Sequence, residues 1–244
     1  MSEPSILAED VSLAYRLAKD MAGSMKEFAI NLLKRQVHYQ SLWALDGVSF
    51  EVPKGEVFAI IGPNGAGKST MLKVLAGVLP PTSGRVIVRG MVSPLIELSG
   101  GMNHEMTGRE NIVQFGTLLG REPELMRQRV DAIAEWAEIS DFLDNPVRNY
   151  STGMTSRLAF AIATDVQPDI LLVDEVLSVG DEKFRRKSTK RIEQLMEAGA
   201  TVVLVSHNLG TVRRMSDRVM WLERGRIKMI GPADEVVDAY EASI

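Results

Sequence analysis

The sequence predicts an α/β fold with a mostly parallel β-sheet, and three observations support this prediction. Apolar runs rich in β-branched residues alternate with segments of helical periodicity, as expected for buried parallel strands joined by helices. A glycine-rich segment, residues 62–70, joins one such run to a helical segment. The chain has 244 residues, of which 45% are hydrophobic, so it can bury a substantial core.

Seven segments are predicted to be strands, most of them continuous apolar runs. Turn signals lie between them: Pro53-Lys54-Gly55 separates the first two, and Glu223-Arg224-Gly225 predicts a tight hairpin. The predicted strands are 48–52, 57–61, 85–89, 170–174, 201–206, 218–223 and 226–230.

Helical periodicity predicts a helix over 71–76, which Gly77 would end, before the turn at 80–84. After this turn, helical periodicity replaces the apolar strand pattern, and a helical subdomain is expected over about 102–166. The whole chain, 1–244, is expected to be a single domain. The predicted helices of the subdomain are 111–119, 123–138 and 157–164.

Composition excludes several classes of protein. The chain has no cysteine, which rules out disulfides and Cys-ligated metals. A net charge of −4 gives no reason to expect a nucleic-acid partner. No apolar run approaches the roughly twenty residues of a membrane span, and the N-terminus does not read as a signal peptide. A membrane role would therefore depend on a partner or a surface helix.

The most informative segment is the phosphate-binding loop Gly62-Pro63-Asn64-Gly65-Ala66-Gly67-Lys68-Ser69-Thr70, which has the form G-x-x-x-x-G-K-[ST]. The glycines let backbone N–H groups converge on phosphate oxygens, and the following helix points its positive end at them. Lys68 is expected to reach the β- and γ-phosphates, and Ser69 to place its hydroxyl on Mg²⁺. The sequence thus predicts a site for a nucleoside triphosphate and Mg²⁺.

A second chemical element is the apolar run 170–173 followed by Asp174 and Glu175. Asp174 is expected to hold Mg²⁺ or its water, and Glu175 to act as general base toward the attacking water. Alone, two acidic residues are common at strand ends, but together with the phosphate loop they complete one site.

The phosphate loop and the Asp174-Glu175 pair, together with the segments described next, resemble the nucleotide-binding subunit of an ATP-binding cassette (ABC) transporter, and the resemblance covers nearly the whole chain. That resemblance implies that the nucleotide is ATP, and it implies a P-loop NTPase core with an N-terminal antiparallel β portion and a helical subdomain. The segment Ser151-Thr152-Gly153-Met154 stands at the family's signature, which implies that it binds the γ-phosphate held by a second copy. Without the family, it would be an ordinary helix N-cap.

Three more positions match the family. Asp181, in Ser178-Val179-Gly180-Asp181, stands in the loop that crosses the dimer interface, and His207 looks like the switch histidine that contacts the γ-phosphate with Lys68. Tyr15 matches the aromatic residue that stacks on adenine. Trp43 is a rival for that role, and either ring could simply be packing.

Departures from the family pattern narrow the resemblance. The segment 95–101, shortly before Met106-Thr107-Gly108, contains no glutamine, and Glu97 is the nearest substitute, as a further Mg²⁺ ligand. Thr152, Met154 and the Val-Gly-Asp segment look like the branch that exports polysaccharides and polyol phosphates, such as O-antigen, capsule, galactan or teichoic acid precursors. Some members add a carbohydrate-binding domain, which is not expected here because the chain ends at Ile244.

Residues 18–40 are predicted to form an amphipathic helix, because apolar residues recur there at helical spacing with basic residues between them. It could pack on its own core, or lie at the membrane interface against a partner or lipid-linked headgroups. Its apolar residues are Met21, Met25, Phe28, Ala29, Leu32, Leu33 and Val37.

The resemblance implies a homodimer that drives two permease subunits at the cytoplasmic face of the inner membrane and moves a lipid-linked glycan. An importer subunit is the first alternative, disfavoured by the missing glutamine. A soluble ABC ATPase would need a long coiled coil or a second cassette. A GTPase would need an N-K-x-D motif, which the sequence lacks.

Overall fold

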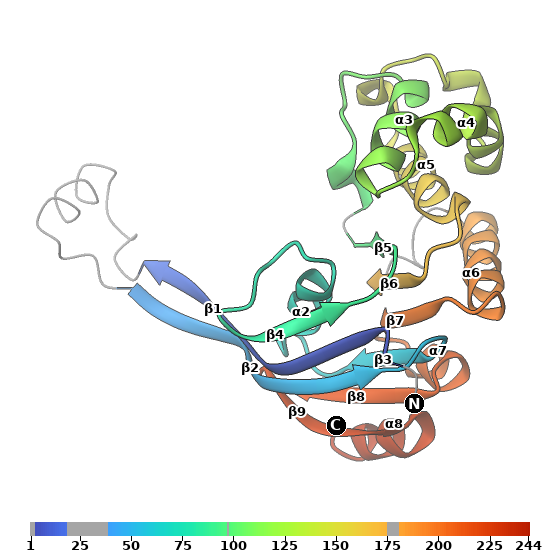
Figure 1. Ribbon diagram of the computed structural model, residues 1–244. Helices are drawn as coiled ribbons and strands as arrows, with labels where there is room; N and C mark the ends of the chain where they lie inside the picture. Colours follow the sequence, from blue (N-terminus) through green and yellow to red (C-terminus); the bar gives the residue numbers. More distant parts are fainter. Residues whose placement is uncertain (1–2, 19–38, 97, 175–180) are drawn as a thin grey trace, which may run out of the picture.

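The computed structural model describes residues 3–18, 39–96, 98–174 and 181–244 (Figure 1). The predicted amphipathic segment 18–40 therefore falls almost wholly outside the described residues. Glu97, Glu175 and Ser178-Val179-Gly180 also lie outside them.

A six-stranded sheet forms the centre of the molecule, and the predicted mostly parallel sheet is confirmed. Five strands are parallel, and the last, β9, runs antiparallel to β8. Arg224 and Gly225, both with positive φ, make the predicted hairpin between these two. The spatial order is β5 (Val92–Leu95), β6 (Ile170–Asp174), β7 (Thr201–Val205), β3 (Val57–Ile61), β8 (Arg218–Glu223) and β9 (Arg226–Pro232).

A second, antiparallel sheet has the order β2-β1-β4, from β1 (Ile6–Ala18), β2 (Tyr39–Val52) and β4 (Ser83–Val88). β4 pairs with β1 only as far as Ser12, so β1 and β2 continue as a two-stranded ribbon that extends from the body in Figure 1. The sequence prediction missed β1, β5 and the first part of β2. In the ribbon, exposed apolar residues and register shifts disturb the alternation that marks a strand.

Helices cover both faces of the central sheet. α2 (Lys68–Leu75) packs between the two sheets, and Gly77, with φ of 72°, follows its end as predicted. α7 (Leu209–Met215) and α8 (Ala233–Glu241) cover the other face of β3 and β8. α6 (Glu182–Glu197) packs with α5 against β6 and β7.

The helical part of the chain stands beyond one edge of the sheet, at the upper right of Figure 1. It contains α3 (Gly108–Leu118), α4 (Pro123–Ala137) and α5 (Thr152–Asp165). α5 begins five residues before the predicted 157, because Ser151 serves as its N-cap. Within the described part of the chain, every helix is too short or too polar to cross a membrane.

Candidate functional site

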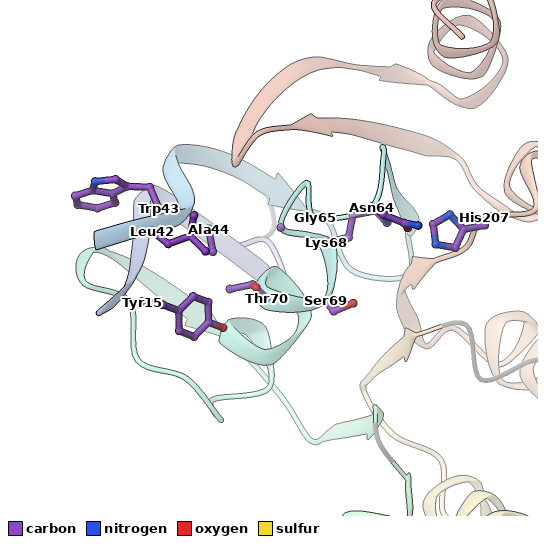
Figure 2. Close-up of a pocket in the computed structure, with 11 residues that line it drawn as sticks. Tyr15, Leu42, Trp43, Ala44, Asn64, Gly65, Lys68, Ser69, Thr70 and His207 are labelled. Atoms are coloured by element: carbon purple, nitrogen blue, oxygen red, sulfur yellow. The ribbon is translucent and has the colours of Figure 1, made fainter. Parts of the chain in front are cut away.

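A surface hollow of about 470 Å³ lies between the loop that follows β3 and the ribbon of β1 and β2 (Figure 2). The loop supplies backbone and hydroxyl groups, and the ribbon supplies apolar and aromatic side chains. The lining residues are Tyr15, Leu42, Trp43, Ala44, Asn64, Gly65, Gly67, Lys68, Ser69, Thr70 and His207.

The path of the loop requires glycine at particular positions. Gly62 and Gly67 have φ of 143° and 106°, a region that L side chains rarely adopt. A Cβ on Gly62 would lie 2.0 Å from the carbonyl oxygen of Leu222, and one on Gly67 would lie 2.3 Å from that of Ala44. At these two glycines the loop backbone therefore lies too close to the backbone of Leu222 and of Ala44 for any side chain to fit between them.

Lys68 lies where the loop passes into α2 and is 6% exposed. Its Nζ donates to the carbonyls of Gly62 at 2.8 Å and Pro63 at 3.0 Å, which ties the ammonium to the loop backbone. α2 begins at Lys68 after Gly67, whose lack of a side chain leaves the positive end of the helix facing the hollow. This combination of an ammonium, a helix N-terminus and a glycine-rich backbone suits a polyphosphate.

Strand order explains why the other predicted groups gather near the loop. β6, β7 and β3 are parallel neighbours, so their carboxyl ends lie at one edge of the sheet. Val205 is the register partner of both Asp174 and Ile60, and His207 follows it two residues later. In Figure 2 His207 lies beside Asn64 of the loop. Asp174, His207 and the loop therefore share this edge.

The residues at this edge fit a magnesium ion held jointly with phosphate oxygens. Ser69 supplies a hydroxyl at the hollow and Asp174 a carboxylate at the end of β6. Mg²⁺ commonly takes one or two carboxylates, with waters and phosphates completing its shell. The described residues include no group of three His, Cys, Asp or Glu side chains that could form a protein-only metal site.

Tyr15 and Trp43 both line the hollow, but they project from opposite faces of the ribbon. Tyr15 pairs with Leu42 in the β1–β2 register and Ala14 pairs with Trp43, and successive residues alternate between faces. Figure 2 shows the Tyr15 ring on the side of Thr70, whereas the Trp43 ring projects away from the loop.

The residues predicted to act on a second copy form a separate group, outside the lining of the hollow as far as the described residues define it. Ser151 accepts at 3.2 Å from the N–H of Met154, and Thr152, Gly153 and Met154 form the first turn of α5. Asp181 caps α6, where it accepts from the N–H of Phe184 at 2.8 Å. These residues therefore lie at two helix N-termini.

Arg157 links these two helix starts and was missed by the sequence analysis. It lies on α5, its Nη2 donates to Asp181 at 2.7 Å, and its guanidinium stands over the ring of Phe184. The N–H of Phe184 and then Arg157 hold the pKa of Asp181 below its usual value. The only signal in the sequence was its place shortly after Met154. Leu42 and Ala44 were also missed, because the ribbon was not predicted.

Comparisons with known proteins find relatives over nearly the whole chain. The chain is 41% identical to the O-antigen export system ATP-binding protein RfbB of Klebsiella pneumoniae, and the match covers 99% of each chain. It is 40% identical to the teichoic acids export ATP-binding protein TagH of Shouchella clausii, over 98% of this chain but 65% of that longer protein.

Among solved structures, the fold is similar to a dimeric ATP-binding cassette, MJ0796, in a post-hydrolysis state with ADP and Pi. The TM-score is 0.73 at 22% identity, covering 93% of this chain and 98% of that one. A family profile described as ABC transporter matches residues 45–178, which include the phosphate loop, Ser151 and Asp174. The chain belongs to the ABC transporter family.

Proposed function

We propose that this chain is the ATP-hydrolysing subunit of an exporter that moves a lipid-linked polysaccharide or polyol phosphate across the cytoplasmic membrane. The observation that carries the proposal is the shared sheet edge where Lys68, Asp174 and His207 meet. The similarity to RfbB and TagH, both named for export, supports the class of substrate.

The residues have distinct proposed roles. The loop backbone and Lys68 bind the β- and γ-phosphates, and Ser69 with Asp174 would hold Mg²⁺, which when bound supplies positive charge to the phosphates. Glu175, which directly follows Asp174, takes the proton from the attacking water. His207 contacts the γ-phosphate and orients it.

The second half of each site comes from another copy of the chain. Ser151, Thr152, Gly153 and Met154 present the N-terminus of α5, where a helix favours an anion. Two copies would enclose two ATP molecules, and closure follows because the closed dimer binds ATP more tightly than the open one. Hydrolysis then reopens the dimer.

A helix of the membrane permease is proposed to dock in a shallow apolar groove of about 470 Å³. The groove lies where α2, β5 and the end of α3 meet, next to the segment that leads to Glu97. Leu118 is 66% exposed at its rim, and the apolar lining matches an apolar helix face. The lining residues are Ala76, Met91, Val92, Pro94, Leu118, Leu119 and Gly120.

The test compares ATP hydrolysis and export in the same variants. Glu175→Gln is expected to lose about 10²- to 10⁴-fold in turnover while it still binds ATP, because only the general base is removed. Lys68→Ala is expected to lose ATP binding as well. Cells in which either variant replaces the wild type should retain the glycan in the cytoplasmic leaflet. Near-normal hydrolysis by Glu175→Gln, or normal export without hydrolysis, would contradict the proposal.

A further inference from the structure

The C-terminal end of α5 is held by side chains from other parts of the chain. The guanidinium of Arg121, in the turn between α3 and α4, is 4% exposed and donates to three backbone carbonyls. These belong to Ile162, Ala163 and Val166, at 3.2, 3.0 and 3.1 Å. The hydroxyl of Ser93, on β5, donates to the same Ala163 carbonyl at 2.6 Å.

Arg191, on α6, completes the arrangement. Its Nε and Nη2 donate to the carbonyl of Thr164 at 3.1 and 2.6 Å, and Nη2 also donates to that of Asp165 at 3.2 Å. Five consecutive carbonyls, 162–166, thus accept hydrogen bonds from side chains. We call these three donors, Ser93, Arg121 and Arg191, the α5 clamp.

The clamp exceeds what helix formation alone requires. The last four carbonyls of a helix lack partners within it and are met by backbone groups, water or a capping side chain, so five carbonyls held by three side chains are more than a helix end needs. At the end of α3, for example, the N–H of Leu119 donates to the carbonyl of Phe115. Burying a guanidinium costs free energy, and burial lowers the pKa of Arg121. The negative end of α5 is therefore fixed by cations at a cost that a surface cap would avoid.

The clamp also joins two parts of the molecule. Ser93 belongs to β5, the edge strand of the central sheet, and Arg191 belongs to α6, which packs against that sheet, whereas Arg121 belongs to the helical part. The end of α5 is where the helical part meets the sheet (Figure 1). The clamp therefore fixes the C-terminal end of α5 relative to the sheet, while Arg157 and Asp181 link its first turns to the start of α6.

We propose that Arg121 and Arg191 are positioning residues for the half-site at Ser151 to Met154, through the fixed direction of α5. This inference rests on the proposed function, in which that half-site meets the nucleotide of a second copy. α5 has 14 residues and is about 21 Å long, so a small tilt at its clamped end displaces its N-terminus. A misplacement of about 1 Å can lower a rate about a hundredfold.

The test uses Arg191→Ala, with Arg129→Ala as matched control. Arg129 contacts the same end of α5, but its bonds of 2.9 and 2.7 Å go to the side chain of Asp165 and to none of the clamped carbonyls. Arg191→Ala should bind ATP as a dilute monomer within about twofold of wild type, because the phosphate loop is untouched, while kcat falls about fivefold or more. ATP-driven dimerisation in a Glu175→Gln background should weaken in parallel. Arg191→Lys should recover part of both losses, and Arg129→Ala should lose neither.

Other results would overturn the inference. The clamp would be merely structural if Arg191→Ala had the same kcat as Arg129→Ala. The same conclusion would follow if Arg191→Ala lowered the ATP affinity of the monomer in proportion to kcat. If Arg191→Ala does not fold, Arg191→Lys takes its place, because a lysine can still donate to the Thr164 carbonyl, and a smaller loss of kcat with unchanged monomer ATP binding is expected. Wild-type protein that neither hydrolyses ATP nor dimerises with it would refute the proposed function instead.

Discussion

At the scale of single residues, the loop after β3 depends on close backbone approach at some glycines and only on backbone conformation at others. Gly62→Ala would place a Cβ 2.0 Å from the Leu222 carbonyl, so the loop or β8 must move. We expect this variant to lose ATP binding and to unfold at a clearly lower temperature than wild type, as measured by calorimetry with and without nucleotide.

Gly65→Ala is the matched control for that prediction. Gly65 has φ of 77°, but a Cβ there would meet no atom within 4 Å. The expected cost is that of a left-handed residue alone, about 1–2 kcal/mol. Equal losses of stability in the two variants would show that close approach at Gly62 is unimportant.

The ribbon offers a second prediction at this scale. Tyr15 and Trp43 project from opposite faces, and the Tyr15 ring lies on the side of Thr70, so we expect Tyr15 to stack on adenine. Tyr15→Ala should weaken ATP binding about tenfold, as base stacking on an aromatic ring is worth about 1–3 kcal/mol, while Tyr15→Phe should retain most of it. Trp43→Ala should change the affinity less, and a larger loss at Trp43 in a titration would assign the role to that ring.

At the scale of elements, α3 begins with a complete capping box. Thr107 Oγ1 accepts from the N–H of Glu110 at 3.2 Å, and the Glu110 carboxylate accepts from the N–H of Thr107 at 2.8 Å. Thr107→Ala is expected to cost about 1 kcal/mol of stability, read from urea unfolding, because the helix loses its N-cap. Thr117→Ala, in the exposed last turn of the same helix, should cost less.

The same capping box predicts a dependence on pH. The bonds from Thr107 hold the pKa of Glu110 below its ordinary 4.5. A carboxyl whose pKa is depressed on folding adds stability above its unfolded pKa, and this is lost as pH falls through the folded value. Glu110→Gln should therefore be less stable than wild type at pH 7, with a difference that shrinks below about pH 4. If the difference in stability between Glu110→Gln and wild type did not change with pH, the charge of Glu110 would not be its cause.

Elements differ in how well they can be predicted from sequence. The bounds of β3, β6 and β8 match the prediction because these strands are continuous apolar runs buried in the sheet. α6 was missed although its buried residues, Phe184 and Ile192 among them, recur at helical spacing, because charged residues dominate between them. The α5 clamp left no local pattern, since Arg121 and Arg191 bond to carbonyls far away in sequence.

At the scale of the whole molecule, the groove beside β5 is expected to receive the permease. Leu118→Glu would place a carboxylate at its exposed rim, and burying that charge against an apolar helix is costly. We expect loss of co-purification with the permease while ATP hydrolysis by the isolated chain is kept. Leu125→Glu, also on an exposed apolar residue but outside the groove lining, is the control and should still co-purify. If Leu118→Glu still co-purified with the permease, the permease would have to dock at another surface.

The proposed composite site makes the strongest prediction at this scale, because its two halves would be disabled by substitutions in different copies. Lys68→Ala removes the phosphate loop's ammonium but leaves Ser151 to Met154, whereas Gly153→Asp places a negative charge at the N-terminus of α5 and leaves the loop. Each variant alone should be inactive. In a mixture of equal parts, half of the dimers would carry one intact site of two, so about a quarter of the wild-type rate should return. If each chain held a complete site, Gly153→Asp would instead be active alone. If the mixture recovers no ATP hydrolysis and the protein shows no rise in molecular mass when ATP is added, the dimer is contradicted.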